Sequence, residues 1–278
     1  MKNKLKIFTG IIFLFFLLIE GCYKAPVEQP YRITELNNLI LLANKSFEKG
    51  ETERAKNLYT EALKKSRIIQ DDNATVIILI SLSRLYTSEG KTEEAKKFID
   101  TAIEFSKKTS LPESTIEELD FERARTGFLF NEDVEEILKK LSFSKFTSIK
   151  IKSLNLLARL KIKQNKHEEA EKLLNEGLEI NQKINRIEEA NSLRLLGEIY
   201  SDKNKEVAEN YLLRALEIDR ELAIPEKIAL DMETLGMFYK KIGDKKKAKE
   251  YFMRTLEIWK ALDKKEFEMK MKDEITKF

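Results

Sequence analysis

Apolar and polar positions beyond residue 33 repeat with the period of an α-helix, in segments that short polar turns separate. Five stretches of the chain can be laid over one another: 41–63, 81–103, 156–178, 195–216 and 234–256. Each stretch begins in one periodic segment, crosses a turn and ends in a second one. Each stretch therefore predicts a pair of antiparallel helices.

Small residues recur at a fixed place in both helices of each pair. In the first helix a leucine precedes the small residue, which in the five copies is Ala43, Ser83, Ala158, Gly197 and Gly236. The second helices carry Ala55, Ala95, Ala170, Ala208 and Ala248. Two helices cross closely only where the side chains at the crossing are small, so we expect each pair to pack at these positions.

One interval between second-helix alanines is longer than the others. Successive alanines are 40, 38 or 40 residues apart, but Ala95 and Ala170 are 75 residues apart. Two ordinary periods fill that interval, with Val134, Leu138 and Leu141 in second-helix positions. We therefore predict a sixth, degenerate pair there, with a first helix over residues 112–129 and an uncertain register.

The repeated pair resembles the tetratricopeptide repeat. Three copies carry an aromatic residue three positions after the small one, namely Tyr86, Tyr200 and Tyr239, whereas Ser46 and Lys161 stand there in two others. The resemblance implies an all-α fold, a right-handed superhelical solenoid of antiparallel helix pairs. It implies six repeats over residues 33–262, the third degenerate, and a polar capping helix over residues 263–278.

Turn residues support these boundaries. Gly50, Gly90 and Gly243 suit the left-handed position that ends a first helix. Thr52, Thr92 and Asp244 suit the N-cap of the following helix, and Pro112 and Pro225 suit the first turn of a first helix.

In such a superhelix the first helices line the concave face, so we expect partner-binding residues there. The solvent-facing stripe beside the packing positions contains Asn37, Ile40, Asn44, Phe47, Ile77, Ile80, Arg84, Lys152, Asn155, Arg159, Asn191, Arg194 and Glu198. This groove is apolar at its start and polar, partly basic, later. Some tetratricopeptide domains clamp a carboxylate with Lys, Asn and Arg, but Ile40 stands where that clamp needs Lys, so we do not expect that activity.

The run 76–80 is apolar around the whole helix and therefore needs burial on both faces. Either the superhelix covers it or a partner segment does.

The first 22 residues have a composition of their own. Three lysines precede an apolar run over residues 7–19, which is too short to span a bilayer and is typical of a signal peptide. Residues 18–22 resemble the lipobox of bacterial lipoproteins, with Glu20 as the departure. The resemblance implies a signal peptide over residues 1–21, a lipidated Cys22 and an extended tether over residues 22–32. The alternative is an uncleaved signal anchor.

The composition includes few of the side chains that catalytic sites usually contain. The 278 residues include one Cys and one His, so no internal disulfide can form. The histidine, His167, lies in a predicted turn and has no evident partner for base catalysis. We find no phosphate-binding loop, nucleophile elbow or zinc motif. We expect no enzyme activity, no cofactor and no metal site.

Charge adds one restriction and one open question. The net charge is +3, and removal of residues 1–21 takes away three lysines and one glutamate, which leaves +1. Such a balance argues against a nucleic-acid partner. Residues 113–138 carry nine acidic and two basic residues, and lysines crowd residues 240–249. These patches are either solvated faces or contacts for a partner.

We therefore expect a lipid-anchored scaffold that binds unidentified envelope proteins and no small-molecule substrate. Its layout resembles the lipoproteins that serve as pilotins of type IV pilus secretins, and others in β-barrel assembly or murein-hydrolase scaffolding. The expected location is the bacterial cell envelope, and Tyr23 after Cys22 favours the periplasmic face of the outer membrane if the cell has one. The alternatives are a structural lipoprotein that self-assembles through its acidic and basic patches, and an envelope enzyme.

Overall fold

The computed structural model describes residues 30–278, which form thirteen α-helices. The signal peptide, the lipobox with Cys22 and residues 23–29 of the tether lie outside the described residues. The helices are α2 (Tyr31–Glu48), α3 (Thr52–Ile68), α4 (Asp72–Ser88), α5 (Thr92–Ser106), α6 (Glu113–Leu129), α7 (Glu135–Leu141), α8 (Thr147–Lys163), α9 (His167–Asn181), α10 (Arg186–Tyr200), α11 (Lys205–Glu221), α12 (Pro225–Ile242), α13 (Lys245–Ala261) and α14 (Lys265–Thr276).

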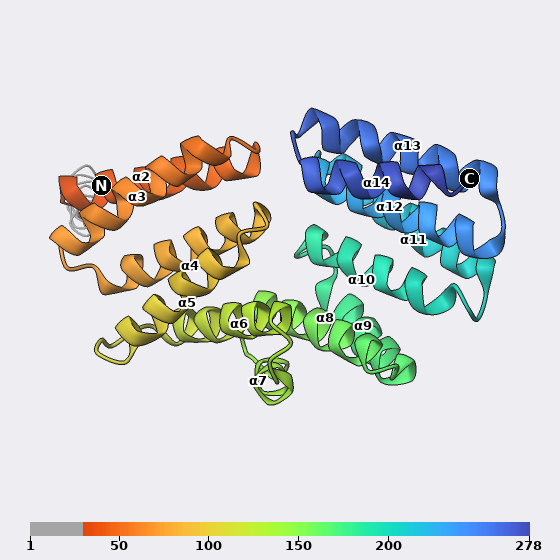
Figure 1. Cartoon of the computed structure of the whole chain (residues 1–278). Coiled ribbons are helices and arrows are strands. Elements are labelled where there is room, and N and C mark those ends of the chain that lie inside the picture. Colours follow the sequence, from red (N-terminus) through yellow and green to blue (C-terminus); the bar gives the residue numbers. More distant parts are fainter. Residues whose placement is uncertain (1–29) are drawn as a thin grey trace, which may run out of the picture.

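Consecutive helices pack as antiparallel pairs, from α2 with α3 to α12 with α13, and α14 packs on α13. The pairs follow one another along an arc, with the first and last pairs facing each other across its open side (Figure 1). The arc is closed at one point, because Lys264 Nζ, beyond α13, donates a hydrogen bond of 3.1 Å to the carbonyl oxygen of Ser88 in α4.

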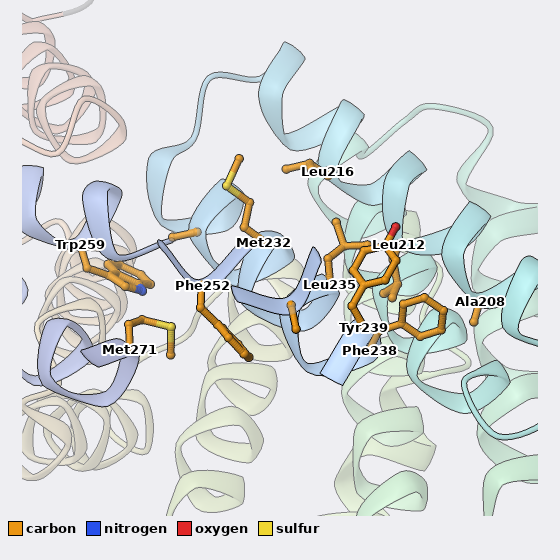
Figure 2. Packing of buried hydrophobic residues seen from close by; sticks show 12 residues of the cluster. Ala208, Leu212, Leu216, Met232, Leu235, Phe238, Tyr239, Phe252, Trp259 and Met271 are labelled. Atoms are coloured by element: carbon orange, nitrogen blue, oxygen red, sulfur yellow. The ribbon is translucent and has the colours of Figure 1, made fainter. Parts of the chain in front are cut away.

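The small residues lie where the two helices of a pair cross. A Cβ atom added to Gly197 would lie 2.5 Å from the side chain of Leu212, and one added to Gly236 would lie 2.7 Å from the ring of Phe252. Glycine is therefore required for this close approach. Figure 2 shows the cluster around the last pair, in which Trp259 of α13 and Met271 of α14 lie at one end and Ala208 of α11 at the other.

The turn inside each pair confirms the glycine prediction and reveals the register of the third pair. Gly50, Gly90 and Gly243 have φ angles of +75°, +78° and +88°. Asn131 takes the same place after α6, with φ of +58°. The amide of Glu132 donates to the carbonyl oxygen of Gly127, as the amide of Lys91 does to that of Tyr86. The third pair therefore ends its first helix as the others do, with Ala124 in the small position.

Three predictions at helix starts need correction. Thr52 and Thr92 are the first helical residues, and the N-cap positions belong to Glu51 and Lys91, whose side chains make no cap bond. Asp244 does cap α13, since it accepts a hydrogen bond from the amide of Lys247. Pro225 lies at the start of α12 as predicted, but Pro112 is the N-cap residue of α6 rather than part of its first turn.

The end of the predicted tether is also different. Tyr31 and Arg32 form the first turn of α2 and are not extended. Pro30 precedes them with an extended backbone, and its carbonyl oxygen accepts from the amides of Ile33 and Thr34, which starts the helix. Within residues 30–278, none of the helices combines the length and the apolar character needed to cross a bilayer.

Candidate functional site

The first helices from α4 to α12 form one continuous wall of the arc. Contacts join α4 to α6, α6 to α8, α8 to α10 and α10 to α12, in addition to the contacts within each pair. The wall is thus built from successive first helices, and neighbouring helices of this kind lie about 8–10 Å apart.

Most predicted groove residues remain accessible. Asn37, Asn44, Arg159, Glu198 and Ile77 are exposed, and Ile40, Phe47, Arg84, Lys152 and Asn191 are half-buried. The run 76–80 is covered by the superhelix itself, except for Ile77, which is 37% exposed. The first of the two alternatives for this run therefore holds for four of its five residues.

Three predicted groove residues do not face solvent. Ile80, Asn155 and Arg194 have exposed fractions of only 2%, 3% and 5%. All three stand three positions before the small residue of their helix. This position points at the neighbouring first helix, so its side chain is covered when the repeats stack.

Asn155 joins α8 to α10 with three hydrogen bonds. Its Nδ2 donates to the backbone oxygen of Glu188 at 3.0 Å and to Glu188 Oε2 at 2.7 Å, and its Oδ1 accepts from Ser192 Oγ at 2.6 Å. A buried amide with these partners is a structural element of the joint between repeats.

Arg194 joins α10 to α11 and α12. It donates to Asp219 Oδ2 at 2.9 Å and also to Asp231. The two carboxylates are 0% and 1% exposed, and one oxygen of each has no partner among the described residues. Burial and the neighbouring Asp231 raise the pKa of Asp219 to about 7, because one guanidinium does not neutralise two buried carboxylates.

The third pair contributes residues that the sequence analysis missed. Glu118 and Glu122 of α6 both accept hydrogen bonds from Arg84 of α4, and Glu118 accepts a further one from Lys152 of α8 at 2.9 Å. Arg125 of α6 adds a second cation beside Glu122, at 2.6 Å. The signal that could have placed them was Asn131, because an Asn is the usual substitute for Gly in the left-handed position.

Arg159 and Glu198 carry charges without an ion-pair partner in the described part of the chain. The guanidinium carbon of Arg159 lies 5.3 Å from the ring centroid of Phe128. Desolvation by the concave wall lowers the pKa of Arg159 and raises the pKa of Glu198. The wall thus crowds both groups with protein atoms, although water still reaches them.

Lys227 at the start of α12 is a third such charge. Its Nζ donates to Asn191 Oδ1 at 2.9 Å, and no carboxylate within residues 30–278 pairs with it. Desolvation, followed by repulsion from Arg194, lowers the pKa of Lys227. The wall from α8 to α12 therefore holds charged groups that form no ion pair among the described residues, although opposite charges attract them from a longer distance.

An apolar cavity of about 660 Å³ lies beside these charges, between α10 and α12. Its lining includes Gly197, Glu198, Leu212, Leu230, Thr234, Met237 and Phe238. Leu230 and Met237 are 39% and 48% exposed. The cavity and Glu198 are contiguous parts of one surface.

The acidic and basic patches are largely neutralised by neighbouring repeats. Five carboxylates of the acidic stretch form ion pairs outside their own helix. Glu118, Glu122, Glu132 and Glu135 pair with a Lys or Arg of another helix, and Glu113 pairs with Lys145 in the turn before α8. In the basic stretch Lys240, Lys241 and Lys247 pair with Glu274, Asp202 and Glu209. These contacts leave fewer charges for association between copies of the chain.

Other titratable side chains show no arrangement for chemistry in the described residues. His167 is exposed at the first position of α9. Glu93, Glu94, Glu168 and Glu169 lie in first turns of helices, where the helix dipole favours anions. Across residues 30–278, His, Cys, Asp and Glu side chains form no group of three that could hold a metal ion.

Comparison with known proteins agrees with the repeat pattern. Models of the tetratricopeptide repeat match residues 150–221, and also residues 77–109 and 232–258. A search of curated proteins finds no significant match to the sequence.

Solved structures with the same architecture include two Rap proteins. The apo form of RapI is 19% identical, with a TM-score of 0.55, and the match covers 85% of this chain and 68% of RapI. A Rap protein complexed with competence and sporulation factor is 15% identical, with a TM-score of 0.62, over 88% of this chain and 76% of that protein. The chain therefore contains tetratricopeptide repeats, and its described residues fold as an all-α tetratricopeptide-repeat superhelix.

Proposed function

We propose that the chain is a scaffold without catalytic activity that binds an extended segment of a partner protein on the wall formed by its first helices. One observation carries the proposal. Arg159, Glu198 and Met237 follow the small residue on three successive first helices. All three are exposed, and neither of the two charges forms an ion pair among residues 30–278. Exposed charged and apolar side chains on one surface are available for contact with a ligand.

Site-specific photo-crosslinking tests this function. In one variant of the full chain, a photoreactive phenylalanine analogue replaces Ile77 of the wall. In a second variant it replaces Met253 of α13, a second helix, where the side chain is 49% exposed. The proposal expects a discrete covalent adduct with another protein from position 77 and none from position 253. Equal labelling from both positions contradicts it.

We further propose that the scaffold is held at a membrane of the bacterial cell envelope by lipid attached to Cys22. The lipobox-like residues 18–22 and the preceding apolar run support this step. Two or more acyl chains anchor a protein stably, whereas one chain anchors it marginally. The partner would then be an envelope protein, in assembly or secretion, and the superhelix would be presented beside the membrane.

The lipid anchor is tested by the variant Cys22→Ala. We expect this variant to accumulate as unprocessed precursor and to lose its tight binding to membranes. We also expect that it does not incorporate a labelled fatty acid. An unchanged electrophoretic mobility and unchanged membrane fractionation would refute the lipobox interpretation. Such a result would not affect the proposal that the wall binds a partner.

A further inference from the structure

One repeat position recurs on each first helix, and we call the side chains at this position the row. It consists of the residue that follows the small position in each first helix: Asn44, Arg84, Arg125, Arg159, Glu198 and Met237. In the middle of the row, Arg84 and Arg125 are neutralised by Glu118 and Glu122. The last three members of the row have no such partners in the described chain. The part of the row without ion pairs therefore presents, in this order, a cation, an anion and an apolar side chain.

Arg159 can bind an anionic group of a ligand. Its guanidinium carbon lies 5.3 Å from the ring centroid of Phe128, within the range of a cation–π contact, which favours this position of the group. Glu198 is the nearest compensating charge, but it lies beyond ion-pair distance. A carboxylate from a ligand would restore the interactions that the guanidinium loses by desolvation.

Glu198 can likewise bind a cationic group of a ligand. Its carboxylate is crowded by the wall, lacks an ion pair and borders the cavity between α10 and α12. The lysines that line the other side of this cavity, Lys240 and Lys241, are already paired with Glu274 and Asp202. Arg194 and Arg159 attract this carboxylate from beyond ion-pair distance, so a direct ion pair with Glu198 is open to a cation from a ligand.

The third position is apolar. Met237 and Leu230 are exposed at the mouth of a cavity of about 660 Å³. Thr234, Phe238 and Leu212 complete its apolar lining. A cavity of this size accepts one large aliphatic or aromatic side chain, and burial of that side chain would also cover the exposed methionine.

The usual distance between packed helices indicates the spacing that a ligand needs to contact the row. Neighbouring first helices lie about 8–10 Å apart. In an extended polyproline-type segment every third residue points the same way, and three residues span about 9.3 Å. A β-strand presents alternate residues at about 6.8 Å, which does not match the helix spacing.

We propose that this wall recognises an extended segment in which an acidic residue, a basic residue and a large apolar residue are spaced three apart. The acidic residue pairs with Arg159, the basic residue with Glu198, and the apolar residue enters the cavity at Met237. The proposal rests on the binding function above and specifies the chemistry of its ligand.

Fluorescence anisotropy with the full chain tests the motif. The probes are labelled Glu-Pro-Pro-Lys-Pro-Pro-Leu and its reverse, because the row does not set the chain direction. The control Pro-Glu-Lys-Leu-Pro-Pro-Pro has the same composition with the three side chains adjacent. One of the two spaced peptides is expected to bind at least about tenfold more tightly than the control.

Charge reversal identifies the contacts. Arg159→Glu, Glu198→Lys and Met237→Lys are each expected to weaken binding about tenfold or more. The matched changes Arg214→Glu and Glu217→Lys on α11 and Met253→Lys on α13 alter exposed residues away from the wall and are expected to have no effect. A peptide with Lys in place of Glu should bind Arg159→Glu better than it binds the unaltered chain.

Two results would overturn the motif. One is that neither spaced peptide binds better than the control, and the other is that wall and control variants lose affinity equally. If position 77 still gives a specific adduct in either case, the wall binds a partner of other chemistry and only the motif is wrong. If position 77 gives no adduct, the proposed function itself fails.

Discussion

Lys161 of α8 donates a hydrogen bond of 2.7 Å to Glu135, at the start of α7 in the preceding repeat. The same place is taken in later repeats by tyrosines: Tyr200 donates to Glu171 at 2.7 Å, and Tyr239 donates to Glu209. The lysine that departs from the repeat pattern therefore makes the contact between repeats that the aromatic residue makes elsewhere. It is 5% exposed, and Glu169 at 3.3 Å is its second anionic neighbour.

Removal of this contact should weaken the joint between the third and fourth repeats. Glu135→Ala leaves a buried ammonium with one more distant partner, and we expect a loss of about 1–3 kcal/mol in the free energy of unfolding. Lys161→Tyr keeps a donor at this place and should cost less than Lys161→Ala. Urea denaturation measures each value, and equal stability of the tyrosine and alanine variants would contradict the assigned role.

The same contact predicts a dependence of stability on acid pH. Hydrogen bonds from Lys161, Lys139 and Gln164 lower the pKa of Glu135 from 4.5 to about 2. A carboxyl with a lowered folded-state pKa stabilises the fold above its unfolded pKa, and this contribution is lost as pH falls from about 4.5 to about 2. The variant Glu135→Gln should therefore differ most from the unaltered chain above pH 5 and least near pH 2, as measured by the unfolding free energy.

The joint between the fifth and sixth repeats should respond to pH in the opposite direction. Burial raises the pKa of Asp219 from 3.8 to about 7, so the folded state binds more protons than the unfolded state between these values. This group therefore destabilises the fold progressively as pH rises from about 4 to about 7.

Asp219→Asn imitates the protonated carboxyl and tests that response. We expect the variant to exceed the unaltered chain in unfolding free energy by more than about 1 kcal/mol at pH 8 and to differ little at pH 4. The comparison is made by denaturant unfolding at both values. A variant that is less stable at pH 8 would show that the ionised pair is favourable beside Arg194.

The glycines within helices should respond to alanine in opposite ways. Gly197→Ala and Gly236→Ala place a Cβ atom against Leu212 and Phe252, so we expect a loss of about 1–3 kcal/mol in unfolding free energy. Gly177 is also helical, but an added Cβ would lie 3.8 Å from its nearest neighbours. Gly177→Ala should therefore stabilise the fold by about 0.5–1 kcal/mol. Thermal unfolding of the three variants is the measurement, and a uniform effect would argue against close helix crossings.

The sequence predicts those features of the fold that depend on neighbours close along the chain. The small residues at the helix crossings and the left-handed glycines at Gly50, Gly90 and Gly243 are of this kind. The third repeat was harder to place, because Gly127 replaces the aromatic residue and α7 has only seven residues. Its register depends on the turn at Asn131, which the structure reveals.

The wall is less predictable, because exposure there depends on how repeats stack. Helical periodicity places Ile80, Asn155 and Arg194 on the same stripe as Arg84, Arg159 and Glu198. Stacking buries the first three against the next first helix and leaves the others accessible. Periodicity within one helix contains no information on this difference. The pairing of Arg84 with Glu118 also joins separate repeats, so it follows from the stacking and not from either helix alone.

The most direct test of the binding wall compares adduct formation from position 77 in two backgrounds. The first carries Arg159→Glu with Glu198→Lys on the wall, and the second carries Arg214→Glu with Glu217→Lys on α11. Both double variants leave the net charge unchanged. The account predicts that the yield of the covalent adduct falls at least about tenfold in the first background and stays constant in the second. Equal yields in both backgrounds would contradict it.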